Sequence, residues 1–98
     1  MKVRYSRRAA HDLDSVRAYL SDRSLRSAVS VLAAIYLAIE FIRRNPEAGQ
    51  KTTIGSVRVK TVRKYRFRIF YRLLEEDQSL EIVHVRHTSR RPWTGNED

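Results

Sequence analysis

The sequence contains no cysteine among its 98 residues. This absence excludes disulfide bonds, thiolate metal ligands and cysteine nucleophiles, and it fits a reducing compartment. Uninterrupted apolar stretches are also short. None approaches the ~20 residues that a membrane-spanning helix needs, and the N-terminus lacks the apolar core of a signal peptide. We therefore expect a soluble protein of the cytoplasm.

Glycine and histidine are scarce as well. The 3 glycines form no phosphate-binding loop, so no nucleotide cofactor is expected. The 3 histidines are His11, His84 and His87, and their spacing matches no zinc-binding or calcium-binding pattern. The sequence therefore predicts neither a cofactor nor a metal.

Acidic residues are outnumbered by basic ones, 11 to 20, which gives a formal net charge of +9. Most of the basic residues are arginines, whose guanidinium groups bind phosphate and carboxylate bidentately. This composition indicates an acidic partner, either nucleic acid or a negatively charged protein. The alternative is that the arginines only keep the surface soluble.

Hydrophobic periodicity in the first half of the chain predicts one strand and two helices. Lys2–Tyr5 alternates and is expected to join a sheet. Apolar residues spaced by three and four predict helices over Arg7–Ser21 and Leu25–Arg44, with Ser6 and Ser24 as N-caps. Because the link between them is short, the helices should form an antiparallel hairpin.

The second half of the chain alternates with period two and predicts three more strands. These strands cover Val57–Val62, Tyr65–Leu74 and Leu80–His87, and Glu75–Ser79 has the composition of a hairpin turn. The resulting order is β-α-α-β-β-β. We expect an α+β domain with the helix hairpin packed on one face of a mostly antiparallel sheet.

One domain should cover residues 1–98, with Pro92-Trp93 packed against the core and 94–98 as a frayed tail. In the Tyr65–Leu74 strand the odd residues are apolar and suit the helices. Phe70 lies on the other face among arginines, so that face is expected to receive a partner. His84 should share the face of Ile82, as a core or hydrogen-bonded histidine.

Four short motifs occur in a characteristic order over about residues 3–93. They are Arg8-Ala9-Ala10-His11-Asp12-Leu13, Asn45-Pro46-Glu47-Ala48-Gly49, Tyr65-Arg66-Phe67-Arg68-Ile69-Phe70-Tyr71 and Val85-Arg86-His87-Thr88-Ser89-Arg90. In this order and spacing the sequence resembles the RelE/ParE superfamily of toxins from type II toxin–antitoxin systems. The ending is similar to that of the ParE branch.

This resemblance implies a toxin that is neutralised by a ParD-like antitoxin in a toxin–antitoxin hetero-oligomer. The antitoxin of such a pair wraps the toxin with a segment that folds on binding. The side chains expected to contact the antitoxin are Leu13, Tyr19, Tyr36, Arg58, Arg68, Phe70 and Arg72.

For the ParE branch the implied activity is binding without catalysis, in which the toxin inhibits DNA gyrase. The target-binding side chains expected on this hypothesis lie at the end of the last strand and just after it. They are Arg86, His87, Arg90, Arg91 and Trp93.

Two alternatives remain. A RelE-like, ribosome-dependent mRNA endonuclease would use Arg68 to stabilise the phosphate and either His84 or His87 as acid or base. Such enzymes usually carry a tyrosine at the end of the sheet, whereas Thr88 follows His87 here. The other alternative is a basic α+β module that binds nucleic acid or a partner without toxicity.

Overall fold

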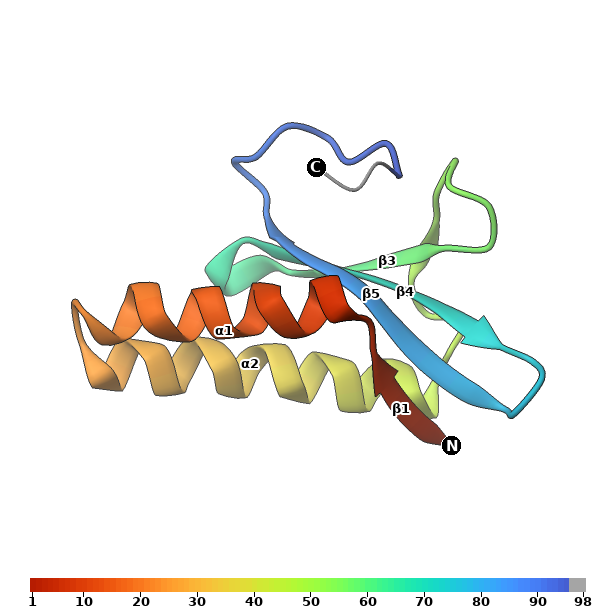
Figure 1. Ribbon diagram of the computed structural model, residues 1–98, viewed down its shortest axis with the longest axis horizontal. Coiled ribbons are helices and arrows are strands. Elements are labelled where there is room, and N and C mark those ends of the chain that lie inside the picture. Colours follow the sequence, from red (N-terminus) through yellow and green to blue (C-terminus); the bar gives the residue numbers. More distant parts are fainter. Residues whose placement is uncertain (96–98) are drawn as a thin grey trace.

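Two helices lie side by side along one face of a five-stranded sheet in the computed structural model, which describes residues 1–95 (Figure 1). The elements are β1 (Lys2–Tyr5), α1 (Arg7–Ser21), α2 (Leu25–Arg44), β2 (Gln50–Lys51), β3 (Arg58–Val62), the 3₁₀ turn η1 (Arg63–Tyr65), β4 (Phe67–Leu74) and β5 (Ser79–His87). The predicted α+β order is confirmed, with the two-residue strand β2 added. Most of the predicted frayed tail, residues 96–98, lies outside the described residues.

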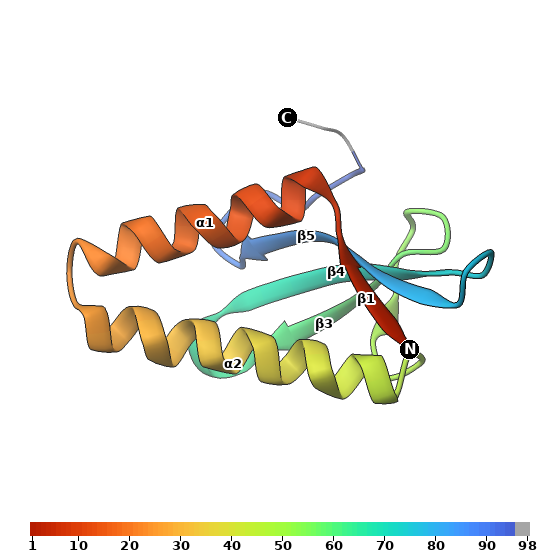
Figure 2. The same ribbon diagram turned by 60° about the horizontal axis from the view of Figure 1, so that its bottom comes forward.

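The helices begin and end where the sequence places their caps. The Ser6 hydroxyl accepts the Ala9 N–H at 2.9 Å, and the Ser24 hydroxyl accepts the Ser27 N–H at 3.2 Å. These bonds satisfy backbone donors that have no partner within the first turn. Asn45, which precedes a proline and avoids the α conformation, ends α2. Figure 2 shows the resulting antiparallel hairpin lying across the sheet.

The strand order is β1-β5-β4-β3-β2, with β1 parallel to β5 and the other pairs antiparallel. β1 covers only the start of β5, because Lys2–Tyr5 pairs with residues 79–82. The second half of β5 therefore has no neighbouring strand at this edge. The chain turns there into α1, and the Ser6 N–H donates to the Ile82 carbonyl at 2.9 Å.

The core lies between the hairpin and the sheet. It combines α2 residues such as Ile35 and Ile39 with Ile69 and Tyr71 from β4 and Ile82 from β5. Each of these side chains is almost fully buried. Burying apolar area of this kind is the main term that holds helices to a sheet.

Tyr71 also anchors the loop that follows α2. Its hydroxyl donates to the Pro46 carbonyl at 2.8 Å and accepts the Gly49 N–H at 2.8 Å. Burial raises the pKa of Tyr71, so the phenol stays neutral and can make both bonds. A Cβ on Gly49 would lie only 2.5 Å from the Tyr71 hydroxyl oxygen.

We therefore expect Gly49→Ala to destabilise the protein by about 1–3 kcal/mol, because the added methyl displaces a buried ring. Gly55→Asn is the matched control. Gly55 has a φ of 49° with open space around it, a conformation that asparagine tolerates. Urea unfolding followed by circular dichroism measures both changes. Equal stability of the two variants would contradict the proposed packing.

The last strand does not alternate as the sequence predicted. Tyr71 pairs with Ile82 while the preceding Phe70 pairs with His84, so Val83 is left opposite no residue. This extra residue is a β-bulge, and it reverses which side chains face the helices. His84 thus lies against Phe70 on the face of the sheet opposite the helices, and the expectation that it shares the face of Ile82 is wrong.

Strand boundaries also shift slightly. The central strand begins at Phe67 rather than Tyr65, because Arg63–Tyr65 forms a 3₁₀ turn and Arg66 takes a left-handed φ of 61°. The turn between β4 and β5 ends one residue earlier than predicted, since Ser79 is already paired.

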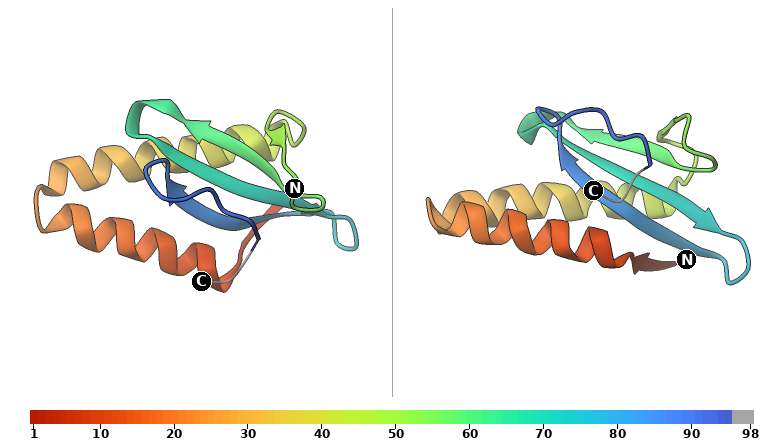
Figure 3. Two further views of the ribbon diagram at one scale, coloured as in Figure 1. Left: turned by 90° about the horizontal axis from the view of Figure 1, so that it is seen from above. Right: turned by 45° about the horizontal axis from the view of Figure 1, so that its top comes forward.

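The far face of the sheet is partly covered by the chain's own C-terminal segment, residues 88–95. After β5 this segment turns back across the sheet on the side opposite the helices (Figure 3). The Trp93 ring centroid lies 4.9 Å from that of Phe70 and 5.0 Å from that of His84. The predicted packing of Trp93 is confirmed. The expected open apolar face is not, because Phe70 is only 7% exposed.

Of the described helices, α2 alone is long and apolar enough to cross a membrane by length and composition, with a mean hydropathy of 1.8. As expected from the sequence, no uninterrupted apolar run is long enough to span a membrane. The helix α2 nevertheless passes by average composition, because charges such as Glu40 are few in it. The buried face of α2, which includes Ile35 and Ile42, belongs to the core. The outer face is apolar as well.

Candidate functional site: a basic groove between helices and sheet

A groove of about 870 Å³ opens between α1, the start of α2 and the end of the sheet. Its floor is apolar and is formed by Val16, Leu20, Val31, Phe67 and Val85. Its remaining lining is polar, with three arginines and one acidic residue, and it is formed by Arg8, His11, Asp12, Ser15, Tyr19, Tyr65, Arg86, His87, Ser89 and Arg90. Within residues 1–95 no three histidine or acidic side chains lie close enough together to hold a metal ion.

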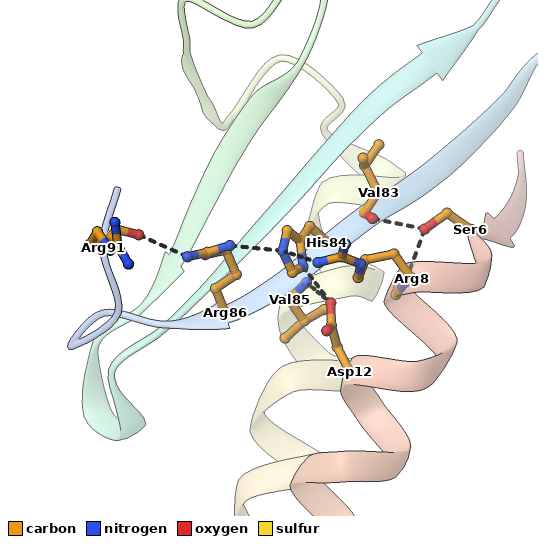
Figure 4. A network of polar contacts seen from close by, with 9 residues as sticks. Ser6, Arg8, Asp12, Val83, His84, Val85, Arg86 and Arg91 are labelled. Carbon is orange, nitrogen blue, oxygen red and sulfur yellow. Dashed lines mark hydrogen bonds and ion pairs between the residues drawn. The ribbon is translucent and has the colours of Figure 1, made fainter. Parts of the chain in front are cut away.

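Asp12 joins α1 to the open edge of β5 beside this groove (Figure 4). Its Oδ2 accepts the Val85 N–H at 2.9 Å and faces His84 Nδ1 at 2.5 Å. The carboxylate takes the place of a neighbouring strand, because a buried backbone N–H without an acceptor is costly. Asp12 is itself nearly buried.

The contacts of His84 define its tautomer. Nε2 lies 3.0 Å from Arg86 Nη1 and 3.4 Å from Arg8 Nη1. A guanidinium group can only donate, so Nε2 accepts and the ring proton sits on Nδ1, where it is donated to Asp12. The ring is neutral and fully buried. His84 therefore holds α1, β5 and the far face together, and no ring nitrogen remains for a substrate.

Arg86 extends this network to the C-terminal segment. Its Nη2 donates to the Arg91 carbonyl at 2.8 Å, and the residue is 6% exposed. Figure 4 shows the continuous path from Asp12 through His84 and Arg86 to Arg91. The segment that follows β5 is thus fixed by a buried polar chain as well as by the Trp93 ring.

His87 occupies the rim of the groove at the end of β5. Its ring packs edge-on against Phe67, with the centroids 5.2 Å apart. Nδ1 accepts the Ser89 N–H at 3.1 Å and lies 2.8 Å from the Ser89 hydroxyl. Nε2 is therefore the ring atom left for a contact with a partner in the groove.

Comparison with known families decides the identity of this fold. The family described as the ParE toxin of the type II toxin–antitoxin system parDE matches residues 3–92. The chain belongs to the ParE toxin family. A comparison with curated protein sequences gives no significant match.

Solved structures of ParE and RelE proteins share the fold. The chromosomal ParDE system of P. aeruginosa aligns with a TM-score of 0.75 and 21% identity, over 89% of this chain and 95% of that chain. The isolated E. coli RelE toxin gives 0.60 and 12%, over 92% and 86%. The RelBE2 toxin–antitoxin complex of Mycobacterium tuberculosis gives 0.55 and 20%, over 88% and 95%. At these identities the likeness concerns the fold alone.

The residues predicted to bind the target of this ParE-family chain lie close in sequence but differ in exposure. Arg90 and Arg91 are exposed, while His87 and Trp93 are half-buried. Arg86 is buried within the network described above, so its role in this structure is to hold the C-terminal segment.

Arg68 and His87, both predicted as candidates for RNA cleavage, point to opposite faces of the sheet. His87 pairs with Phe67, and Arg68 pairs with Arg86 one position along the ladder. Successive residues of a strand face opposite sides of the sheet. His87 therefore faces the groove, whereas Arg68 faces the side that carries the C-terminal segment.

The residues predicted to contact the antitoxin of a ParE-family toxin are spread over the molecule. Leu13 and Phe70 are buried, and Tyr19 alone of the set lines the groove. Tyr36 lies exposed on the outer side of α2.

The arginines of that set already make polar contacts within the chain or face the far side of the sheet. Arg58 donates to the Gly49 carbonyl at 2.9 Å, and Arg72 pairs with Glu81 at 2.8 Å. Arg68 is half-buried beside Arg86.

Sequence reasoning missed the central role of Asp12 in this ParE-family fold. The signal was present, because Asp12 follows Ala9 by three residues and precedes Val16 by four, within the apolar stripe of α1. An acidic residue in such a stripe requires a buried partner.

Proposed function

We propose that this ParE-family chain is the toxin of a type II toxin–antitoxin pair that acts in the cytoplasm. It inhibits DNA gyrase by binding, and a ParD-like antitoxin neutralises it. The observation that carries the proposal of binding over cleavage is the opposed orientation of Arg68 and His87. Cleavage of RNA needs a base, an acid and a cation around one phosphate. Arg68 and His87 start on opposite faces of the sheet, and His84 is fully buried with both ring nitrogens already bonded.

The gyrase contact is proposed at the C-terminal segment. Arg90 and Arg91 are exposed there, next to His87 on the groove rim. Arg86 and Trp93 hold this segment against the sheet. A segment fixed before binding loses less conformational entropy in the complex, so the two guanidinium groups are presented at low cost.

The antitoxin contact is proposed in the groove itself. An apolar floor beneath a basic rim fits an amphipathic helix that carries acidic residues along its edges. The net charge of +9 attracts such a segment over long range. Tyr19 stands at the mouth of the groove, 59% exposed, with the Arg23 guanidinium 3.8 Å above its ring.

We expect the double substitution Arg90→Ala/Arg91→Ala to raise the concentration needed for half-inhibition of gyrase supercoiling at least ~10-fold, through the loss of two charged contacts. The control is Arg7→Ala/Arg63→Ala, which removes the same charge from exposed sites elsewhere. An equal loss of gyrase inhibition in both variants would show that the effect comes from the lower net charge and not from contacts of Arg90 and Arg91. Cleavage of ribosome-bound mRNA by the wild type, without inhibition of gyrase, would overturn the proposed function.

A further inference from the structure

The outer face of α2 is a largely exposed apolar ridge, on which Lys60 Nζ lies 5.0 Å from the centroid of the Phe41 ring. Leu25 and Leu37 are each 71% exposed, and Val29 is 60% exposed. With the exposed Ala33 and Phe41 they recur every fourth residue, on the side opposite the buried residues of the helix. The sixteen steps from Leu25 to Phe41 span about 24 Å of helix, so this is a continuous surface rather than scattered side chains.

The order of residues along this ridge is symmetric about Ala33. Two positions that lie equally far before and after Ala33 carry matching residues. Small or apolar residues are matched with apolar ones, and a basic residue is matched with an acidic one. The matched positions are Val29 with Leu37, Leu25 with Phe41, Ser30 with Tyr36, and Arg26 with Glu40. A twofold axis through an antiparallel helix pair brings such positions of two copies together.

We propose that the outer face of α2 is a homodimer interface in which two copies of this chain pack their α2 helices antiparallel, with Ala33 at the crossing point. The small Ala33 side chain allows a close approach at the axis. The ridges formed by every fourth residue then interdigitate on either side of it. This inference does not depend on the proposed gyrase activity.

Charge on this face supports a second copy as the occupant. Two chains of net charge +9 repel each other overall. At the ridge, however, Arg26 of one copy approaches Glu40 of the other at two symmetric positions, where Glu40 also keeps its bonds to Arg43 and Arg44 of its own chain. The Arg43 and Arg44 guanidinium groups lower the pKa of Glu40 to about 2, so this carboxylate is charged at neutral pH.

The size of the ridge sets the strength of the dimer. A stable interface buries roughly 800 Å² on each partner, and a single helix pair of this length buries less. We therefore expect a reversible dimer with a dissociation constant of about 1–100 µM. Such a dimer appears or disappears with protein concentration.

Sedimentation velocity of the wild-type chain between about 1 and 200 µM tests the proposal. The expected result is a rise in average mass toward twice that of one chain. Leu37→Glu should raise the dissociation constant at least ~10-fold, since it buries a charge at the ridge. Ala18→Glu on the exposed side of α1 should leave it unchanged, and circular dichroism verifies that both variants fold.

Cysteine cross-linking tests the register, because the native chain has no cysteine. A mixture of Val29→Cys and Leu37→Cys chains should oxidise mainly to mixed dimers, and each variant alone should cross-link weakly. A wild type that stays monomeric at every concentration overturns the proposal. So does preferential cross-linking of identical variants. Flotation of a monomer with vesicles of phosphatidylcholine and phosphatidylglycerol would assign the ridge to a lipid surface instead.

Discussion

Asp12→Ala is expected to lower the free energy of unfolding by about 3–5 kcal/mol, the largest effect of any single substitution proposed for this fold. The change removes the acceptor of both the Val85 N–H and the His84 Nδ1–H. Both donors are buried, so water does not replace the lost carboxylate without opening the contact between α1 and β5. Chemical denaturation followed by circular dichroism measures the loss.

Two further substitutions make this result specific. Asp12→Asn keeps one acceptor oxygen and should fall between the wild type and Asp12→Ala. Asp14→Ala removes an exposed carboxylate that pairs with Arg17 at 2.9 Å, and it should change stability by less than about 0.5 kcal/mol. A loss below about 1 kcal/mol for Asp12→Ala would show that the buried network does not hold α1 to β5.

Val16→Asp is expected to weaken binding of the cognate antitoxin at least ~100-fold. Val16 lies half-buried on the groove floor, where an added carboxylate would lie among apolar side chains and face the acidic edges of the helix proposed to bind there. Isothermal titration calorimetry on the purified pair gives the dissociation constant. Ala18→Asp, two residues along on the exposed side of α1, carries the same charge and should bind as the wild type does.

Thermal unfolding of Val16→Asp separates a binding defect from a folding defect. The groove proposal requires that the folded fraction at the titration temperature stays close to that of Ala18→Asp. Unchanged affinity in a folded Val16→Asp protein would place the antitoxin elsewhere on the surface. The outer ridge of α2, around Tyr36, would then be the next surface to test.

Local sequence patterns were sufficient for most of the fold. Spacings of three and four defined both helices, and the hydroxyl groups of Ser6 and Ser24 defined where they begin. Period-two alternation located the strands. The proline after Asn45 defined the end of α2. Each of these signals acts over a few residues, so a single sequence contains it in full.

Features that depend on pairing between distant residues were not predictable in the same way. No residue near Val83 marks it as a bulge. In Leu80–His87 both faces of the strand carry apolar residues, whether the alternation is regular or is interrupted at Val83. The orientation of His84 follows from that bulge. The burial of Phe70 was not predictable either, since it involves the rings of Trp93 and His84 from distant parts of the chain.

The candidate site shows the same division. Arginine content and the residues after β5 indicated where charge would gather. The groove itself required the actual angle between the helices and the sheet. The separation of Arg68 from His87 required the strand register, which a one-residue slip reverses.

Because Val83 is left out of the strand pairing, the even-numbered residues of β5 face the helices before it and the opposite side of the sheet after it. Before it, β5 contributes Leu80 and Ile82 to the interior beneath the helices. After it, His84 and Arg86 face the opposite side of the sheet, where they contact the C-terminal segment. Deletion of Val83 would direct the His84 imidazole toward the helices and would remove the contacts that hold the C-terminal segment. The surface that carries Arg90 and Arg91 would then no longer have a fixed shape.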